Sequence, residues 1–152
     1  DSLFRSHPWN CLIKRVELAK DTATPSWGFS YQFTLPADCL RVITILNYDY
    51  DYKIEGRKVL ANHATVKIQY VSRVTDANEY DELLRETISA SLAADIAFAV
   101  TSSNPTASNM YKLFQDKLRE ARFVDATEGQ NTNPDNGQSD VVGASSFINS
   151  RY

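Results

Sequence analysis

The chain has 152 residues, of which 43% are hydrophobic and 23% charged, and its formal net charge is −3. This composition is typical of one globular domain with a single core. It excludes the Lys and Arg excess of a basic nucleic-acid-binding surface, and no apolar run approaches the roughly 20 residues of a membrane-spanning helix. We therefore expect a soluble protein that does not enter the membrane.

The two cysteines, Cys11 and Cys39, are too few for a disulfide framework. They indicate a reducing compartment, and we expect both to be small, buried apolar side chains. The sequence shows no secretory signal.

Residues 1–7 predict the last turns of a helix that ends before Pro8, because the residue before a proline is disfavoured in the helical conformation. A helix rarely begins at the first residue, and the chain starts at Asp1 without a methionine. We therefore expect that an upstream segment is missing.

Residues 9–73 predict a small, mostly antiparallel sheet, because apolar and polar side chains alternate with a period of two. Residues 40–46 are apolar on both faces, which is typical of a central strand. Glu55 and Gly56 predict a tight turn between two antiparallel strands. The expected strands are 11–18, 29–35, 40–46, 47–54, 57–60 and 65–73.

Residues 76–126 predict a helical hairpin, because the period changes to 3.6 near Thr75 and Asp76. Either residue can cap the first helix, together with Glu79. Asn104 and Pro105 end that helix, and a second should run from about residue 106 to 126. The expected apolar faces are Leu84, Ile88, Leu92, Ile96 and Val100, widened by Leu83, Ala93 and Ala97, on the first helix, and Met110, Tyr111, Phe114, Leu118 and Ala121 on the second. The predicted fold class is α+β, with a single domain over residues 1–126.

Residues 127–152 predict a flexible C-terminal extension, because they are rich in Gly, Asn, Asp, Gln and Ser. Residues 125–152 hold four acids and one base, whereas residues 1–124 hold 15 of each, so this end carries the whole net charge. The extension finishes in the apolar residues Phe147, Ile148 and Tyr152. Composition alone fits a tether with a docking tip as well as an end without function.

No catalytic or metal-binding motif is present, so the sequence predicts neither an enzyme nor a cofactor. His7 and His63 have the surroundings of ordinary polar or packed histidines. Asp49, Asp51 and Glu55 could hold a calcium ion, but an exposed polar strand face gives the same pattern. We favour the exposed face.

Aromatic residues gather at two places in the predicted sheet. Tyr48, Tyr50 and Tyr52 could stack on bases or sugars, but the acids between them would repel a nucleic acid, so core packing is favoured. Trp9 and Trp27 flank the first strand. They either anchor a partner surface or form a wall of the core, and core packing is again the favoured interpretation.

Several blocks of the chain are similar, in order, to one family of phage proteins. The most specific are the block Leu-Phe-Arg-Ser-His-Pro-Trp-Asn at residues 3–10 and the block ending in Leu-Pro-Ala-Asp-Cys-Leu-Arg-Val at residues 28–42. Further matches lie at residues 54–57, 70–76 and 146–151. Together they resemble the head-to-tail adaptors of short-tailed bacteriophages, also called tail tubular protein A.

The resemblance implies a structural role in the virion, at the interface between head and tail, for a protein made in the host cytoplasm. Members form a twelve-fold ring below the portal protein, extend the channel through which DNA passes, and contact the next tail protein. They combine a helix bundle with a small β-domain and a C-terminal extension that reaches the portal. For this chain, the expected docking residues are Phe147, Ile148, Arg151 and Tyr152, and DNA is expected to pass through the channel without sequence-specific binding.

Two other classes of function remain open from the residues. One is a β-rich module of a phage particle that binds the host or a carbohydrate. The other is a small hydrolase whose site has no recognisable motif.

Overall fold

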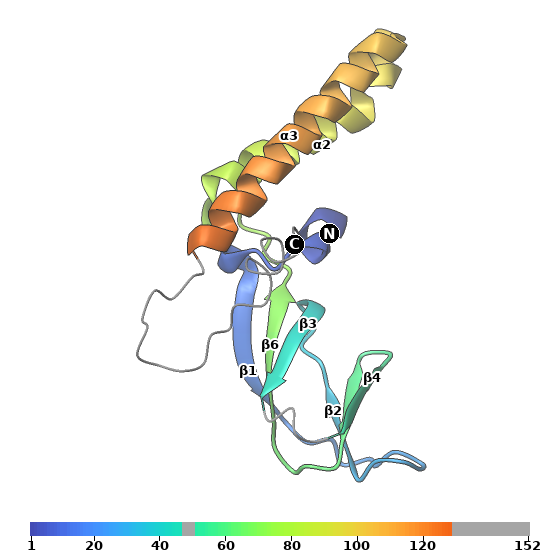
Figure 1. Ribbon diagram of the computed structural model, residues 1–152. Helices are drawn as coiled ribbons and strands as arrows, with labels where there is room; N and C mark the ends of the chain where they lie inside the picture. Colours follow the sequence, from blue (N-terminus) through green and yellow to red (C-terminus); the bar gives the residue numbers. More distant parts are fainter. Residues whose placement is uncertain (47–50, 129–152) are drawn as a thin grey trace, which may run out of the picture.

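The computed structural model describes residues 1–46 and 51–128 (Figure 1). Two small sheets form one end of the molecule, and a long helical hairpin projects from the other end. The α+β class is confirmed. The elements, in order, are α1 (Ser2–Ser6), η1 (Asn10–Leu12), β1 (Ile13–Leu18), β2 (Tyr31–Thr34), β3 (Cys39–Leu46), β4 (Tyr52–Glu55), β5 (Lys58–Ala61), β6 (Val66–Ser72), η2 (Ala77–Glu79), α2 (Glu82–Thr101) and α3 (Asn104–Glu128).

The first helix ends as the sequence predicts. Its C-cap residue, His7, is extended at φ −143° and ψ 145°, which is the conformation that the following Pro8 requires. The first strand begins later than predicted, because residues 10–12 form a 3₁₀ turn. Cys11 in that turn is half-buried, whereas Cys39 at the start of β3 is buried, and burial raises the pKa of both thiols.

The strands form two antiparallel sheets of three strands, in the orders β1-β6-β3 and β2-β5-β4. The prediction of one sheet with β3 at its centre is therefore wrong, because β6 is central and β3 lies at an edge. β3 is apolar along much of its length because both of its faces are covered by other parts of the molecule. Ile45 packs into the core between the sheets, while Leu40 and Ile43 pack toward the helices.

The central strand β6 links two cores. Ile68 and Tyr70 point into the core between the two sheets, together with Phe33 and Val59. The next residue, Val71, points to the opposite face and is fully buried against the helical part. The period of two in this strand therefore serves both cores, since alternate side chains face opposite sides of a sheet.

The hairpin between β4 and β5 confirms the predicted turn. Glu55 pairs with Lys58, so Gly56 and Arg57 form a two-residue loop. Gly56 has φ +59°, which glycine adopts without strain and which the first position of such a turn requires. β4 is exposed along its whole length, so the expected core packing of Tyr52 is wrong. Tyr48 and Tyr50 lie outside the described residues.

The long helix α2 begins six residues later than predicted. Asp76 caps the 3₁₀ turn η2 instead, accepting a hydrogen bond from the Asn78 N–H at 2.9 Å. Asp81 is the N-cap of α2 and accepts from the Leu83 N–H at 2.9 Å. The Tyr80 hydroxyl donates to the Val74 carbonyl at 2.6 Å, which closes the loop that contains η2.

The hairpin of α2 and α3 packs through only part of the predicted apolar face of α2, since Leu84 and Ala97 are buried as predicted but the distal aliphatic residues are not. The buried side chains of α2 are Leu84, Thr87, Ala90 and Ala97. Small residues at this spacing let two helix backbones approach closely. Leu92, Ile96 and Val100 of the predicted stripe are exposed. On α3, Tyr111 is exposed as well, whereas Met110, Phe114, Leu118 and Ala121 are at least partly buried, as predicted.

We expect the protein to lose stability at alkaline pH because of Tyr70. Burial, and then the charge of Asp38, raises the pKa of this tyrosine to about 12 from an ordinary value of 10.0. The folded state therefore holds the proton where the unfolded state releases it. We expect a stabilising contribution that is complete below pH 10 and decreases as the pH rises to 12, by about 2–3 kcal/mol in total. Urea unfolding of wild type and Tyr70→Phe between pH 10 and 12 would measure this contribution. The same decrease in the free energy of unfolding for both proteins would contradict the prediction.

Candidate functional site

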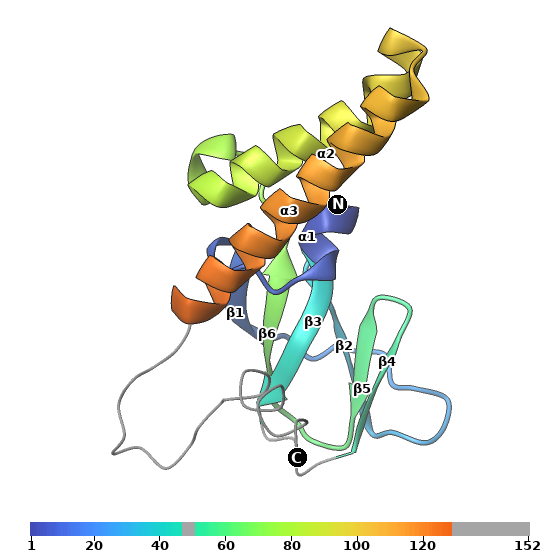
Figure 2. The ribbon, with the colours of Figure 1, turned by 45° about the horizontal axis from the view of Figure 1, so that its top comes forward.

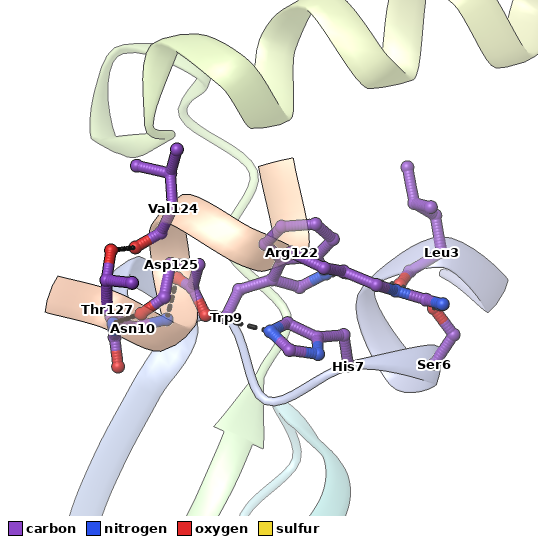
Figure 3. Close-up of polar contacts among 9 residues, drawn as sticks. All are labelled: Leu3, Ser6, His7, Trp9, Asn10, Arg122, Val124, Asp125 and Thr127. Carbon is purple, nitrogen blue, oxygen red and sulfur yellow. Dashed lines mark hydrogen bonds and ion pairs between the residues drawn. The ribbon is translucent and has the colours of Figure 1, made fainter. Parts of the chain in front are cut away.

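The N-terminal segment and the end of α3 are fastened together by Asp125 (Figure 3). One oxygen of this carboxylate is 2.9 Å from His7 Nε2, and the other accepts from the Asn10 backbone N–H at 2.8 Å. The Asn10 side-chain amide donates to the Asp125 carbonyl oxygen at 2.7 Å. These contacts join segments more than 110 residues apart, and we call them the Asp125 clasp.

Trp9 fills the core beneath the clasp. Its side chain is 2% exposed and packs with Leu12, Val71 and Leu84, between the sheet and the helices. Its indole N–H donates to the Leu3 carbonyl at 3.3 Å, and its ring meets the edge of the His7 ring, with centroids 4.7 Å apart. The favoured interpretation, a wall of the core, fits Trp9.

The clasp was not predicted, because in the sequence Asp125 is only one of the acids at the end of the predicted second helix and beyond it. In the structure Asp125 belongs to α3, and its side chain is only 11% exposed. A signal was present in the His-Pro-Trp-Asn block. A proline that ends a helix and is followed by Trp and Asn indicates a chain held in one extended path, which needs a partner for its polar groups.

Three arginines gather at the C-terminal end of α1. Arg5 belongs to α1 itself. Arg41, from β3, donates from Nη1 to the Arg5 carbonyl oxygen at 3.1 Å. Arg122, from α3, donates from Nη2 to the Ser6 hydroxyl at 3.1 Å, and its buried Nε has no hydrogen-bond partner. Among the described residues none of the three guanidinium groups is ion-paired with a carboxylate. We call them the arginine cluster.

The outer face of α2, on the side away from α3, is apolar over its distal half. Leu92, Ile96 and Val100 lie at four-residue spacing on this face and are 59%, 55% and 74% exposed. From Thr87 to Thr101 the helix carries a single charge, Asp95. A helix that is apolar nearly all round is normally buried on all sides. Here α3 covers only one side, so the outer face of α2 has the character of a contact surface.

Acidic residues precede and begin the same helix. Asp76, Glu79, Asp81 and Glu82 all lie within seven residues, and all are exposed. Asp76 and Asp81 use their carboxylates to cap backbone N–H groups. Glu82 reaches only Arg85, at 3.8 Å. We call residues 76–82 the acidic segment.

The remaining candidate residues from the sequence are scattered. Trp27 is 86% exposed in the loop between β1 and β2, so the expectation of core packing is wrong for it. Asp51 is exposed, and Glu55 pairs with Lys53 at 2.7 Å. Asp49 and the predicted docking residues Phe147, Ile148, Arg151 and Tyr152 lie outside the described residues.

Neither the histidines nor the acids of the described chain form a recognisable chemical site. No group of three or more His, Cys, Asp or Glu side chains within residues 1–46 and 51–128 is placed to hold a metal ion. His63 Nδ1 lies 3.0 Å from the Thr65 carbonyl oxygen, which is a local turn contact. His7 belongs to the clasp.

A groove on the first sheet has a volume of about 360 Å³. It is shallow, and no aromatic side chain lines it. Sugar-binding sites usually present an aromatic ring to the sugar, so this groove gives the carbohydrate alternative little support. Its lining residues are Arg15, Val16, Glu17, Thr44, Leu46, Lys67, Ile68 and Gln69.

None of the helices within the described residues is both long and apolar enough to cross a membrane. Comparison with known proteins found no match, either among protein-family models or among curated protein sequences.

Proposed function

We propose that this protein is a structural subunit of a phage virion, an adaptor that assembles as a ring beneath the portal protein and attaches the tail. The observation that carries the proposal is the outer face of α2. Three large aliphatic side chains are exposed there on a helix with one charge in fifteen residues. Such a face supports permanent assembly better than a free monomer or a small-molecule site.

The occupant that we propose for this face is a second copy of the chain. Closed rings are built from head-to-tail contacts, in which two different surfaces of one subunit meet. The hairpin offers two such surfaces, because the outer face of α2 and the outer face of α3 point in opposite directions. The α3 face is polar and includes Lys112, Asp116 and Arg119, together with the exposed Phe123.

The sequence blocks that resemble head-to-tail adaptors give the ring its proposed place in the virion. In that reading the C-terminal end docks on the portal, through Phe147, Ile148 and Tyr152 as apolar anchors and Arg151 as an ionic contact. A near-neutral body suits a channel wall, because a basic wall would bind DNA phosphates and slow their passage. The next tail protein would bind the opposite end of the ring.

Electron microscopy of the purified chain, alone and mixed with portal protein, tests this proposal. We expect rings, or density below the portal, and we expect deletion of residues 145–152 to weaken portal binding. If neither preparation yields rings or portal-bound density, the adaptor function is wrong. Unchanged portal binding after the deletion would instead reject the docking role of the C-terminal residues alone.

A further inference from the structure

We infer that the arginine cluster of one copy binds the acidic segment of a neighbouring copy. This contact rests on the proposed function, since it names the charged part of a head-to-tail interface. The surface is formed by Arg5, Arg41 and Arg122, and its partner is residues 76–82 of a second copy. None of the charged side chains of the two surfaces belongs to the Asp125 clasp, and Tyr80 is the one residue of the acidic segment that packs against the core.

The arginine cluster has unused capacity to bind carboxylates. A guanidinium group has five N–H donors, yet each of Arg41 and Arg122 makes one hydrogen bond to a neutral oxygen of α1. Arg5 makes no side-chain hydrogen bond or ion pair within the described residues. The Nε of Arg122 is shielded from water without a partner, which is costly. The planar guanidinium presents its donors in a fixed fork, so it loses less entropy for each hydrogen bond that it forms to a carboxylate.

The acidic segment is the best matching surface on the described chain. It holds four carboxylates in seven residues and is exposed throughout, apart from the partly buried Tyr80. Two of the acids are fixed in space, because Asp76 and Asp81 accept backbone hydrogen bonds. Glu79 makes no ion pair among the described residues, and Glu82, with its side chain 84% exposed, makes only the long contact to Arg85. Both glutamates can therefore reach a partner.

The two surfaces lie toward different sides of the subunit, as a head-to-tail contact requires. In Figure 2, α1 sits above β3 at one edge of the sheet, and α2 begins above β1 at the other edge. Glu82 also lies near the outer face of α2, since it precedes Ile96 by close to four whole turns of the helix. Burial of that apolar face against a neighbour would bring the acidic segment to the same interface.

A nucleic acid is the other polyanion that arginines bind, and the cluster suits it less well. Asp1 and Asp38 lie close to α1 and the start of β3, and they pair with Arg73 and Lys14. Carboxylates beside the cluster would repel a long phosphate backbone, whereas a short acidic segment can fit between them.

Charge reversal tests the contact by sedimentation velocity. Arg5→Glu with Arg41→Glu makes the cluster acidic, and Glu79→Lys with Glu82→Lys makes the acidic segment basic. We expect each double variant alone to associate on the order of a hundredfold more weakly than wild type, because like charges would meet. A one-to-one mixture of the two should associate again, since each interface then joins opposite charges. Circular dichroism checks that both variants are folded.

The matched control is Arg15→Glu with Lys53→Glu, which changes the net charge equally at exposed positions on the sheets. It should associate like wild type. If the cluster and segment variants associate normally, or if their mixture does not recover, the inference is wrong while the ring itself stands. If the cluster variant no longer binds duplex DNA but still self-associates, the arginine cluster binds a nucleic acid. That result also overturns the inference. A wild-type chain that never self-associates, alone or on the portal, removes the proposed function and this contact together.

Discussion

Replacing Leu92 and Ile96 with aspartate should abolish ring assembly while leaving the subunit folded. Both side chains are more than half exposed in the free subunit, so the substitutions leave its core intact. In the assembled state each new carboxylate would replace an aliphatic side chain at the contact and would lose its water. Burial of such charges costs several kcal/mol, which corresponds to a loss of association of more than about a hundredfold. Sedimentation velocity and electron microscopy would measure the loss.

Ile54→Asp provides the matched control for this prediction. Ile54 is an exposed aliphatic residue of similar size, but it lies on β4, away from the hairpin. We expect assembly of this variant to equal that of wild type. Equal assembly of the α2 variant would show that the outer face of α2 stays in water, and the proposed mode of assembly would have to be abandoned.

Asp125→Ala should destabilise the subunit by about 2–3 kcal/mol. The substitution removes the hydrogen bond to the Asn10 N–H and the contact with His7, and both involve a carboxylate that is largely shielded from water. Hydrogen bonds to charged groups contribute about 1.5–3 kcal/mol each, and the contribution of the Asn10 bond is reduced because Asn10 is exposed. Urea unfolding, followed by circular dichroism, gives the change in the free energy of unfolding.

Asp116→Ala is the corresponding control on the same helix. Asp116 is exposed and makes one ion pair with Arg119, at 3.6 Å, within its own helix. Such pairs contribute at most about 0.5 kcal/mol, so the control should be close to neutral. A loss for Asp125→Ala no larger than that of the control would mean that the clasp does not stabilise the fold.

The clasp also has a consequence for assembly. It fixes the last turns of α3 against the N-terminal segment, three residues before the described part of the chain ends. The end of α3 is therefore held in place by contacts of Asp125 with His7 and Asn10. A weakened clasp should reduce portal binding even where the C-terminal residues themselves are unchanged.

Local patterns in the sequence predicted the elements well. The period of two located most of the strands, because alternate residues of a half-buried strand face opposite environments. Gly56 and the proline after His7 identified a turn and a helix end through backbone conformation alone. These predictions succeeded because each depends on a few neighbouring residues.

Predictions that depended on packing were less successful. The predicted apolar face of α2 includes Leu92, Ile96 and Val100, which are exposed, and omits Thr87 and Ala90, which are buried. Periodicity identifies an apolar face but does not say which of two apolar faces meets the neighbouring helix. Trp27 and Tyr52 were assigned to the core for the same reason, since aromatic composition does not distinguish a core from an exposed surface.

The sequence by itself determined the α+β class, the boundaries of most strands, the helical hairpin and the near-neutral charge of the body. Only the tertiary structure decided which faces were left uncovered, and it brought Asp125 to His7 and Arg122 to Ser6 across more than 110 residues. The physical reason is that secondary structure follows from interactions between neighbours in the chain. The proposed assembly surfaces, in contrast, are the faces that stay uncovered after distant segments have packed, and no local pattern in the sequence identifies them.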